Sequence, residues 1–356
     1  MARARVLRWV LVALSATLAV VLIVAGNTVA GVLIGAIAVV RASLLLSRPR
    51  RRTFAGQGSF ERPAFGNRAG AGRGGRGRFG DNVPMSTLSV SGVSRQYIVH
   101  RPARPSTGAP MPLVVVMHGG FGSAAQAQRA YGWDALADSQ GFVVVYPNGT
   151  SRTWNAGTCC GPAARDQIDD VGFIDALLVE MQRAGDIDAD RVYATGMSNG
   201  AMMAYRLACQ LPGRFAAIGP VAGTMTVPCT SAKPISVCHI HGLADQNVLF
   251  GGGVSPRGFA KDARPSVASV IAGWRTIDGC GPVAARDDGP VHTETAQSAR
   301  GDTVTLITVA GAGHQWPGSR PAAARAVRAL GLDPPTMALD ATATLWQFFS
   351  AHPRRA

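Results

Sequence analysis

Residues 84–356 are predicted to form a doubly wound α/β domain with a mostly parallel sheet and an antiparallel N-terminal edge. Two observations predict this fold. Short apolar runs rich in β-branched residues alternate with amphipathic stretches, as in successive βα units. The runs are also apolar enough to be covered on both faces. The chain has 356 residues, 47% of them hydrophobic, which excludes disorder throughout and a small disulfide-stapled protein.

The elements follow one another in a regular order. Residues 88–90 and 95–99 predict an opening hairpin around the turn at 91–94. Buried strands are predicted at 113–117, 142–146, 191–195, 215–221, 235–239 and 304–309. Helices are predicted at 124–139, 170–183, 199–210, 266–278 and 339–351. Such sheets carry their chemistry in the loops after the carboxyl ends of the strands.

Residues 1–47 are predicted to be a basic n-region followed by a hydrophobic signal anchor. Residues 9–40 carry no charge, and as a helix they span about 48 Å against a hydrocarbon core of about 30 Å. The run exceeds the h-region of a cleaved signal, so an uncleaved anchor is favoured over cleavage after Ala36–Ala38. A two-helix hairpin turning at Asn27 is the least favoured option.

Residues 48–83 are predicted to be an Arg/Gly-rich disordered tether, because they show no apolar periodicity. Contact with anionic lipid fits this segment better than RNA binding, since it directly follows the predicted span. The net charge of +14 lies almost entirely here: residues 1–80 hold 13 Arg and one acid, leaving 22 basic and 20 acidic residues for the rest. No nucleic-acid partner is therefore expected.

Two features of the sequence disagree about the side of the membrane on which the domain lies. The basic residues after the apolar run outnumber the three before it, which places the domain in the cytoplasm. Six cysteines favour an oxidising compartment, with 15 pairings open: Cys159, Cys160, Cys209, Cys229, Cys238 and Cys280. Cys238 is predicted to be a free, inert thiol. Cys159 and Cys160 are predicted to reach two partners, because a bridge between neighbours is strained.

The strand at 191–195 leads into Gly196-Met197-Ser198-Asn199-Gly200 and then into a helix. A tight strand-to-helix turn of this kind needs both glycines and exposes the serine. A serine nucleophile also needs a base that a third group orients. Asp245 and His314 each follow a later strand, in the order Ser198, Asp245, His314 that this architecture uses. The three residues are the predicted catalytic triad.

Backbone amides are predicted to stabilise the oxyanion. One is that of Asn199, and the other is that of Gly120 or Phe121 in the loop after 113–117, which His118 is expected to order. Trp154 and Trp316 flank the site loops and are candidates for the substrate pocket, with packing in the core as the equal alternative.

A metal site is not expected. His239 lies within an apolar run and is predicted to point away from the loop of His241, and no second cluster supplies a third histidine at ligand spacing. Asp170, at the start of a predicted helix, is interpreted as a cap rather than a catalytic group. The sequence predicts no cofactor.

Seven motifs in order resemble the secreted polyhydroxybutyrate depolymerase-like and feruloyl esterase-like serine esterases, of α/β-hydrolase fold. They are Met117-His-Gly-Gly, Tyr146-Pro-Asn-Gly, Trp154-Asn-Ala-Gly-Thr-Cys-Cys-Gly161, Asp169-Asp-Val-Gly-Phe-Ile174, Gly196-Met-Ser-Asn-Gly-Ala-Met-Met203, His241-Gly-Leu-Ala-Asp245 and Gly313-His-Gln-Trp-Pro-Gly318. The resemblance implies hydrolysis of carboxylic esters by Ser198, His314 and Asp245. It also implies disulfides at the Cys159–Cys160 loop and export, with the enzyme either anchored at the outer membrane face or secreted.

The chain departs from that family in two ways. No cysteine lies between Asp288 and Val309 to pair with Cys280, and the anchor and tether are not typical of enzymes that degrade insoluble polymer. Soluble or surface esters are therefore the expected substrates, with hydroxyalkanoate, feruloyl and acetyl esters left open. A serine peptidase of the same fold and a non-catalytic binding module remain alternatives. The oligomeric state is not indicated.

Overall fold

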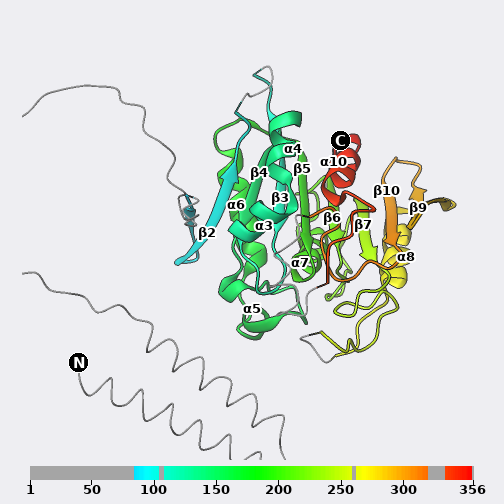
Figure 1. Ribbon diagram of the computed structural model, residues 1–356. Coiled ribbons are helices and arrows are strands. Elements are labelled where there is room, and N and C mark those ends of the chain that lie inside the picture. The colour runs from blue at the N-terminus through cyan, green and yellow to red at the C-terminus, as the bar shows by residue number, and fades with distance from the viewer. Residues whose placement is uncertain (1–83, 104–107, 259–261, 320–332, 355–356) are drawn as a thin grey trace, which may run out of the picture. The chain divides into compact units, whose positions relative to one another are not determined.

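The computed structural model describes residues 84–103, 108–258, 262–319 and 333–354 (Figure 1). The chain divides into two units, Met1–Gly77 and Arg78–Ala356. The predicted anchor at 9–40 lies outside the described residues, as does the tether at 48–83. The domain limits in this region stay predictions. Within the described ranges, no helix is long and apolar enough to cross a membrane.

The second unit is built on one ten-stranded sheet in the order β1-β2-β4-β3-β5-β6-β7-β10-β9-β8. Its six central strands, from β4 to β10, are parallel, and the β1–β2 hairpin joins them antiparallel at one edge. The strands are β1 Ser86–Val90, β2 Val93–His100, β3 Met111–Met117, β4 Val143–Pro147, β5 Ile187–Met197, β6 Ala217–Val221, β7 Ser236–Gly242, β8 Ala284–Asp288, β9 Val291–Gln297 and β10 Thr303–Val309. This arrangement confirms the predicted fold class.

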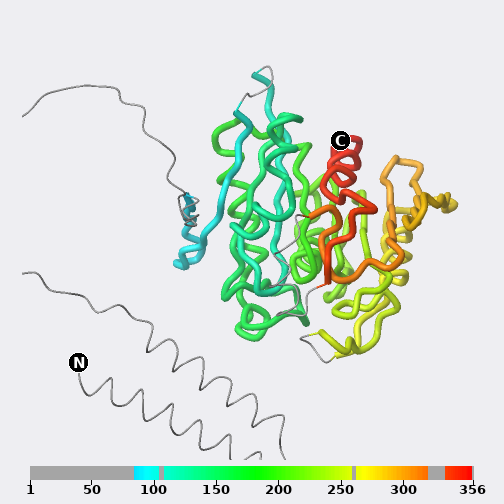
Figure 2. The backbone as a smooth tube through the Cα atoms, in the orientation of Figure 1, coloured from blue at the N-terminus to red at the C-terminus, as the bar shows by residue number. Residues whose placement is uncertain are grey.

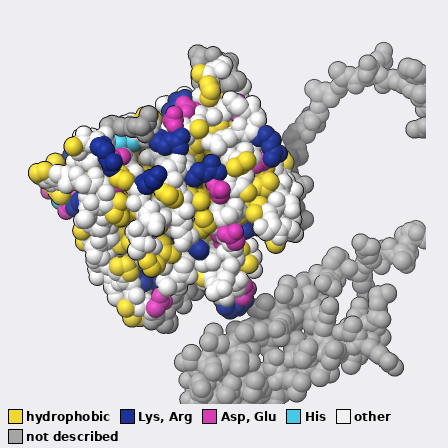
Figure 3. Space-filling model, turned by 180° about the vertical axis from the view of Figure 1, so that it is seen from behind, with side chains coloured by type: hydrophobic (Ala, Val, Ile, Leu, Met, Phe, Trp, Pro, Cys, Tyr) yellow, Lys and Arg dark blue, Asp and Glu magenta, His cyan; other side chains and the backbone are white. Residues whose placement is uncertain are grey.

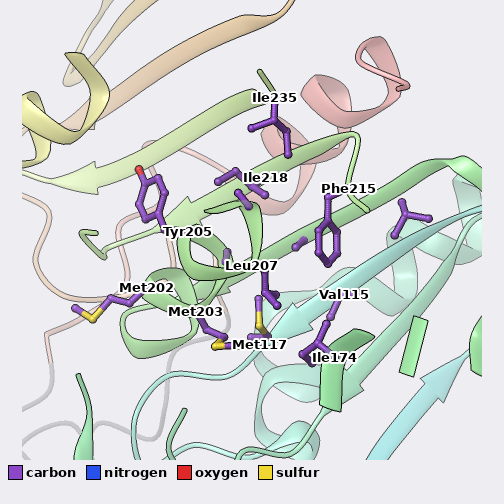
Figure 4. Close-up of a cluster of buried hydrophobic side chains, with 14 of the residues drawn as sticks. Val115, Met117, Ile174, Met202, Met203, Tyr205, Leu207, Phe215, Ile218 and Ile235 are labelled. Atoms are coloured by element: carbon purple, nitrogen blue, oxygen red, sulfur yellow. The ribbon is translucent and has the colours of Figure 1, made fainter. Parts of the chain in front are cut away.

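The helices are α3 Ala124–Tyr131, α4 Trp133–Gln140, α5 Gly161–Arg165, α6 Asp170–Gln182, α7 Asn199–Gln210, α8 Val267–Asp278 and α10 Ala341–Ala351, with a 3₁₀ turn at Thr150–Arg152. They form two layers. Helices α3, α4 and α10 share one core with alternate strand residues, while α6, α7 and α8 share another. Figure 4 shows side chains of α7 packed with strand residues such as Val115 and Ile218. In β3, Val114 and Val116 face one core and Val115 faces the other. Burial on both faces explains the continuous apolar runs.

One predicted element was wrong, and one hairpin was missed. The single helix predicted at 124–139 is two helices, because Gly132 adopts φ 81° and ends α3 where α4 begins. The β8–β9 hairpin at the second sheet edge was not predicted. All five residues of β8 are exposed and polar or small, so they show no alternation of buried and exposed positions. The backbone trace in Figure 2 shows the chain returning from this edge to α10, which contacts β5, β6 and β7.

The cysteine pairing also differs from the prediction. Cys159 is bonded to Cys160 and not to a separate partner, and the peptide between them is cis, so their Cα atoms lie 3.0 Å apart. The prediction rested on the strain expected of a bridge between neighbouring cysteines. Cys209 is bonded to Cys229. Cys238 is free and buried, as predicted, and burial raises the pKa of its thiol to about 12.

On the face of the unit in Figure 3, basic and acidic side chains are intermixed. Several charged side chains of the unit are ion-paired, for example Arg214 with Asp175 at 2.5 Å and Arg191 with Asp188 at 2.7 Å. This face agrees with the near balance of 22 basic and 20 acidic residues after residue 80.

Candidate active site

Ser198 stands in the tight turn between β5 and α7. Its backbone has φ 55° and ψ −117°, a conformation that L residues rarely adopt. The flanking glycines make the turn possible. A Cβ atom at Gly196 would lie 2.7 Å from the carbonyl oxygen of Met117, and one at Gly200 would lie 2.4 Å from the same oxygen. The turn therefore presses against the end of β3.

Three side chains from different loops meet at this turn. His314 Nε2 lies 2.9 Å from Ser198 Oγ, and His314 Nδ1 lies 2.7 Å from Asp245 Oδ2. An ionised carboxylate only accepts hydrogen bonds, so Nδ1 carries the proton and Nε2 accepts from the hydroxyl. The structure thus brings together the three residues singled out in the sequence. The arrangement can remove the hydroxyl proton as the oxygen attacks a carbonyl.

Asp245 is 2% exposed and is held by its own loop. Its Oδ1 accepts hydrogen bonds from the backbone N–H groups of Asn247 and Val248, at 2.8 and 2.9 Å. Burial acts to raise the pKa of Asp245, but the hydrogen bond and charge of His314, with smaller contributions from His241 and the Val248 N–H, bring it below its ordinary value. The carboxylate therefore stays ionised at neutral pH.

A second carboxylate, which the sequence analysis missed, holds the histidine loop. Asp333 Oδ2 accepts a hydrogen bond of 2.7 Å from the backbone N–H of His314. Asp333 Oδ1 lies 3.5 Å from Arg257 Nη1. The contact links positions 19 residues apart, and no motif around Asp333 marks it.

The three backbone N–H groups predicted as oxyanion donors differ in whether they already have a hydrogen-bond partner. Asn199 begins α7, so its backbone N–H has no partner within the helix. Gly120 lies beside it, since a Cβ atom at Gly120 would be 3.9 Å from the Asn199 Cβ, and in the described ranges no partner takes the Gly120 N–H. The Phe121 N–H, however, donates to Arg152 O at 2.8 Å. Of the two candidates in this loop, the Gly120 N–H is therefore the one without a partner among the described residues.

His118 orders this loop, as expected. Its ring is fully buried, its Nδ1 lies 2.8 Å from Gly119 O, and its Nε2 accepts from the Gly149 N–H at 3.0 Å. Burial lowers the pKa of His118 to about 4. The imidazole is thus neutral, with one ring nitrogen donating to a backbone carbonyl and the other accepting from a backbone N–H.

Trp154 and Trp316 are core residues rather than pocket residues. Their exposures are 0% and 1%, which leaves no surface to line an open pocket. The indole N–H of Trp154 donates to His118 O at 2.9 Å, while that of Trp316 donates to Thr342 Oγ1 at 3.0 Å. Trp316 also stacks on Tyr131 at 4.4 Å between ring centroids. Each of these two buried indole N–H groups thus has a polar partner inside the fold.

The Asn199 side chain clamps Trp154. Its Oδ1 accepts from the Trp154 N–H at 2.7 Å, and its Nδ2 donates to Trp154 O at 3.0 Å. The sequence analysis assigned only the backbone of Asn199. The clamp ties the residue after Ser198 to the loop that supports His118.

Asp170 is not a helix cap. Asp169 caps α6, accepting from the Gly172 N–H at 2.8 Å. Asp170 is fully buried, 2.6 Å from Arg95 Nη2, and accepts from the Asn155 N–H at 2.7 Å. This buried ion pair anchors the loop that carries Trp154.

His239 does not point away from His241. Residues two apart on a strand share a face, and His239 Nε2 lies 3.0 Å from His241 Nδ1. Tyr205 Oη lies 2.8 Å from His239 Nδ1, and His241 Nε2 lies 2.8 Å from Val248 O. Because Val248 O only accepts, His241 Nε2 carries the proton and donates to it. With both rings neutral, His239 Nε2 then donates to His241 Nδ1, and the Tyr205 hydroxyl donates to His239 Nδ1. In the described residues, no group of three or more His, Cys, Asp or Glu side chains could hold a metal ion.

The chain is similar to known esterases. The family model "Esterase PHB depolymerase" matches residues 96–260. NocK of Nocardia uniformis subsp. tsuyamanensis, named as a candidate esterase, is 33% identical over 249 residues, which are 64% of this chain and 72% of that protein. Poly(3-hydroxyalkanoate) depolymerase C of Paucimonas lemoignei is 33% identical over 172 residues, 47% of this chain and 40% of that protein.

Other relatives are more distant. Feruloyl esterase B of Piromyces equi is 26% identical over 62% of this chain and 42% of its own length. The chain thus spans less than half of this enzyme and of the depolymerase. Among solved structures, the acetyl xylan esterase from Aspergillus awamori is 16% identical with a TM-score of 0.49, over 70% of this chain and all of that one.

Proposed function

The chain belongs to the PHB depolymerase family of esterases, and from that premise we propose that it is a serine esterase that forms its acyl-enzyme on Ser198. It is a carboxylic ester hydrolase of α/β-hydrolase fold. The observation that carries the serine mechanism is the pair of hydrogen bonds, 2.9 and 2.7 Å long, that joins Ser198, His314 and Asp245.

The first half of the reaction forms the acyl-enzyme. Ser198 Oγ attacks the ester carbonyl while His314 Nε2 takes the hydroxyl proton. The backbone N–H groups of Asn199 and Gly120 stabilise the negative charge on the carbonyl oxygen. The imidazolium then gives its proton to the leaving alkoxide, and the C–O bond to the alcohol breaks.

The second half releases the acid. Water loses a proton to His314 as its oxygen attacks the acyl carbonyl, and the bond to Ser198 Oγ breaks as the proton returns to the serine. Asp245 stays ionised throughout, because its pKa lies below the ordinary value, and stabilises the imidazolium in both halves.

Short, soluble carboxylic esters are the proposed substrates. The relatives are named for feruloyl, acetylxylan and poly(3-hydroxyalkanoate) esters, which share only the bond that is cleaved. A panel of acetyl, feruloyl and 3-hydroxybutyryl esters ranks the acyl groups by kcat/KM.

Hydrolysis of p-nitrophenyl esters from C2 to C8 by wild type, Ser198→Ala and Ser139→Ala tests the mechanism. Ser139 is an exposed serine on α4, remote in the fold from β5 and α7, and serves as the matched control. We expect at least about a 10³-fold loss of kcat in Ser198→Ala and none in the control. Equal activity in all three proteins contradicts the acyl-enzyme on Ser198.

We also propose that the folded unit acts outside the cytoplasm, anchored through residues 9–40. The support is the disulfide between Cys209 and Cys229 and the uncharged apolar run. Protease added to intact cells should digest the unit. Protection of the unit until the cells are lysed contradicts export.

A further inference from the structure

Arg264 is a partly buried arginine without a carboxylate partner. No Asp or Glu oxygen of the described residues lies within 4.0 Å of its guanidinium, and its side chain has one hydrogen bond, from Nη1 to Met202 Sδ at 3.2 Å. A thioether sulfur is a weak acceptor. Asp262 acts on Arg264 only at longer range. Most of the five N–H donors are therefore available to a ligand.

Three other arginines near the site already have a carboxylate or carbonyl partner. Arg95 is paired with Asp170, Arg257 lies 3.5 Å from Asp333, and Arg206 donates to Asn155 O. The structure does not describe residues 259–261 and 320–332, but these ranges contain no acidic residue and so hold no side-chain carboxylate for Arg264.

Arg264 lies against the turn that carries Ser198. Met202, its contact, is on the first turn of α7, and the Met202 N–H donates to Ser198 O at 3.0 Å. Residues four apart on a helix have Cβ atoms about 5–6 Å apart. In Figure 4, Met202 lies at the margin of the buried cluster, and the residue is only 1% exposed. The guanidinium therefore contacts a side chain that follows the nucleophile by about one helical turn.

Two loops at the carboxyl end of the sheet hold the Arg264 segment in this place. On one side, Thr224 Oγ1 donates to Pro265 O at 3.1 Å, next to Gly223, where a Cβ atom would lie 3.1 Å from Ser198 O. On the other side, the backbone of Arg264 pairs with Gly253, in the loop that continues from Asp245. Arg264 is thus fixed between the loop beside the nucleophile and the loop of the acid.

We propose that Arg264 binds a carboxylate of the substrate, so that the enzyme prefers esters that also carry a free carboxylate. This inference rests on the proposed serine esterase. The planar guanidinium matches a carboxylate with two parallel hydrogen bonds. Partial exclusion of water strengthens the attraction. Two classes of ester carry such a carboxylate. In a half-ester of a dicarboxylic acid it is on the acyl side of the scissile bond, and in an ester of a carboxylate-bearing alcohol it is on the alcohol side.

Two matched pairs of substrates separate these sources. Mono(4-nitrophenyl) adipate and 4-nitrophenyl methyl adipate differ in a carboxylate on the acyl side. 3-Acetoxybenzoate and 3-acetoxybenzamide differ in a carboxylate on the alcohol side. The pair with the larger anionic-to-neutral ratio of kcat/KM identifies the side that Arg264 faces.

Three variants of the full chain test the residue. Arg264→Gln should lower kcat/KM for the preferred anionic ester by about 10- to 100-fold, mainly through KM, and leave the neutral ester within about twofold. Arg264→Lys, which keeps the charge but loses the planar fork, should fall between. Arg183→Gln removes the charge of an exposed arginine directly after α6, where it pairs with Glu180, and should change neither ratio.

Two results overturn the proposal. One is a wild-type anionic-to-neutral ratio near one for both pairs. The other is an equal loss on charged and neutral esters in Arg264→Gln, which shows a packing role on Met202. Ser198→Ala runs in parallel. If it retains full turnover, the proposed function fails, whereas loss of turnover there with an unchanged ratio in Arg264→Gln refutes only the carboxylate site.

Discussion

Asp278 makes the stability of the folded unit depend on pH. It is the last residue of α8 and is 3% exposed. Its Oδ1 accepts from the Ile235 N–H at 3.2 Å, but its Oδ2 is buried without a partner. Burial, together with the nearby charge of Asp302, raises the pKa of Asp278 to about 7. The end of a helix adds negative potential at the same place.

The magnitude follows from linkage. An unfolded Asp has a pKa of about 3.9, so the difference of about three units corresponds to about 4 kcal/mol. Below pH 4 the carboxyl is protonated in both the folded and the unfolded state, so it does not lower the free energy of unfolding. Between pH 4 and pH 7 only the unfolded state loses the proton, so the free energy of unfolding falls by about 1.4 kcal/mol per pH unit. Above pH 7 the loss is complete.

Asp278→Asn removes this dependence and supplies N–H donors in place of the bare oxygen. Urea unfolding followed by tryptophan fluorescence measures the free energy of unfolding of both proteins at pH 5 and pH 8. We expect the variant to be more stable by about 1.5 kcal/mol at pH 5 and by about 4 kcal/mol at pH 8. Asp288→Asn, on exposed β8, controls for the loss of one charge. A difference that is the same at both pH values refutes the reasoning.

Two further predictions concern the support of the site. Asn199→Ala should lower the free energy of unfolding by about 1–3 kcal/mol, since it leaves the buried N–H of Trp154 unpaired, and it should lower kcat as well. Urea unfolding and p-nitrophenyl acetate hydrolysis check both, and an unchanged midpoint speaks against the clamp. Gly200→Ala should abolish activity, because its Cβ would lie 2.4 and 2.6 Å from the backbone oxygens of Met117 and His118. Gly273→Ala, whose Cβ meets nothing within 4 Å, is its control, and wild-type kcat in Gly200→Ala contradicts the tight turn.

The strands were predictable because burial on both faces demands uninterrupted apolar residues. The prediction at 113–117 falls within β3, and the observed strand reaches only two residues further, to Met111. The β8–β9 hairpin escaped prediction since an exposed edge places no such demand on its sequence. The break at Gly132 was missed because the amphipathic pattern continues through it, and one glycine with φ 81° decides the end of the helix.

The candidate site divides in the same way. Ser198, Asp245 and His314 could be selected because each follows a strand and their chain order suits the fold, and the structure brings them within hydrogen-bonding distance. The partners of Phe121 and Trp316 could not be predicted. Whether a backbone N–H is free or an indole is buried depends on segments distant in sequence, such as Arg152 for Phe121 and Thr342 for Trp316.

The sequence by itself determined the fold class, the loops at the ends of the strands and the residues able to carry acyl chemistry, because periodicity and motif order are local properties of the chain. Only the tertiary structure decided which groups support them. Asp333 holds the His314 loop, Asn199 clamps Trp154, and Arg264 lies over Met202. These contacts form between loops from separate strands, and a hydrogen bond or an unpaired charge depends on distances that exist only after the sheet has assembled.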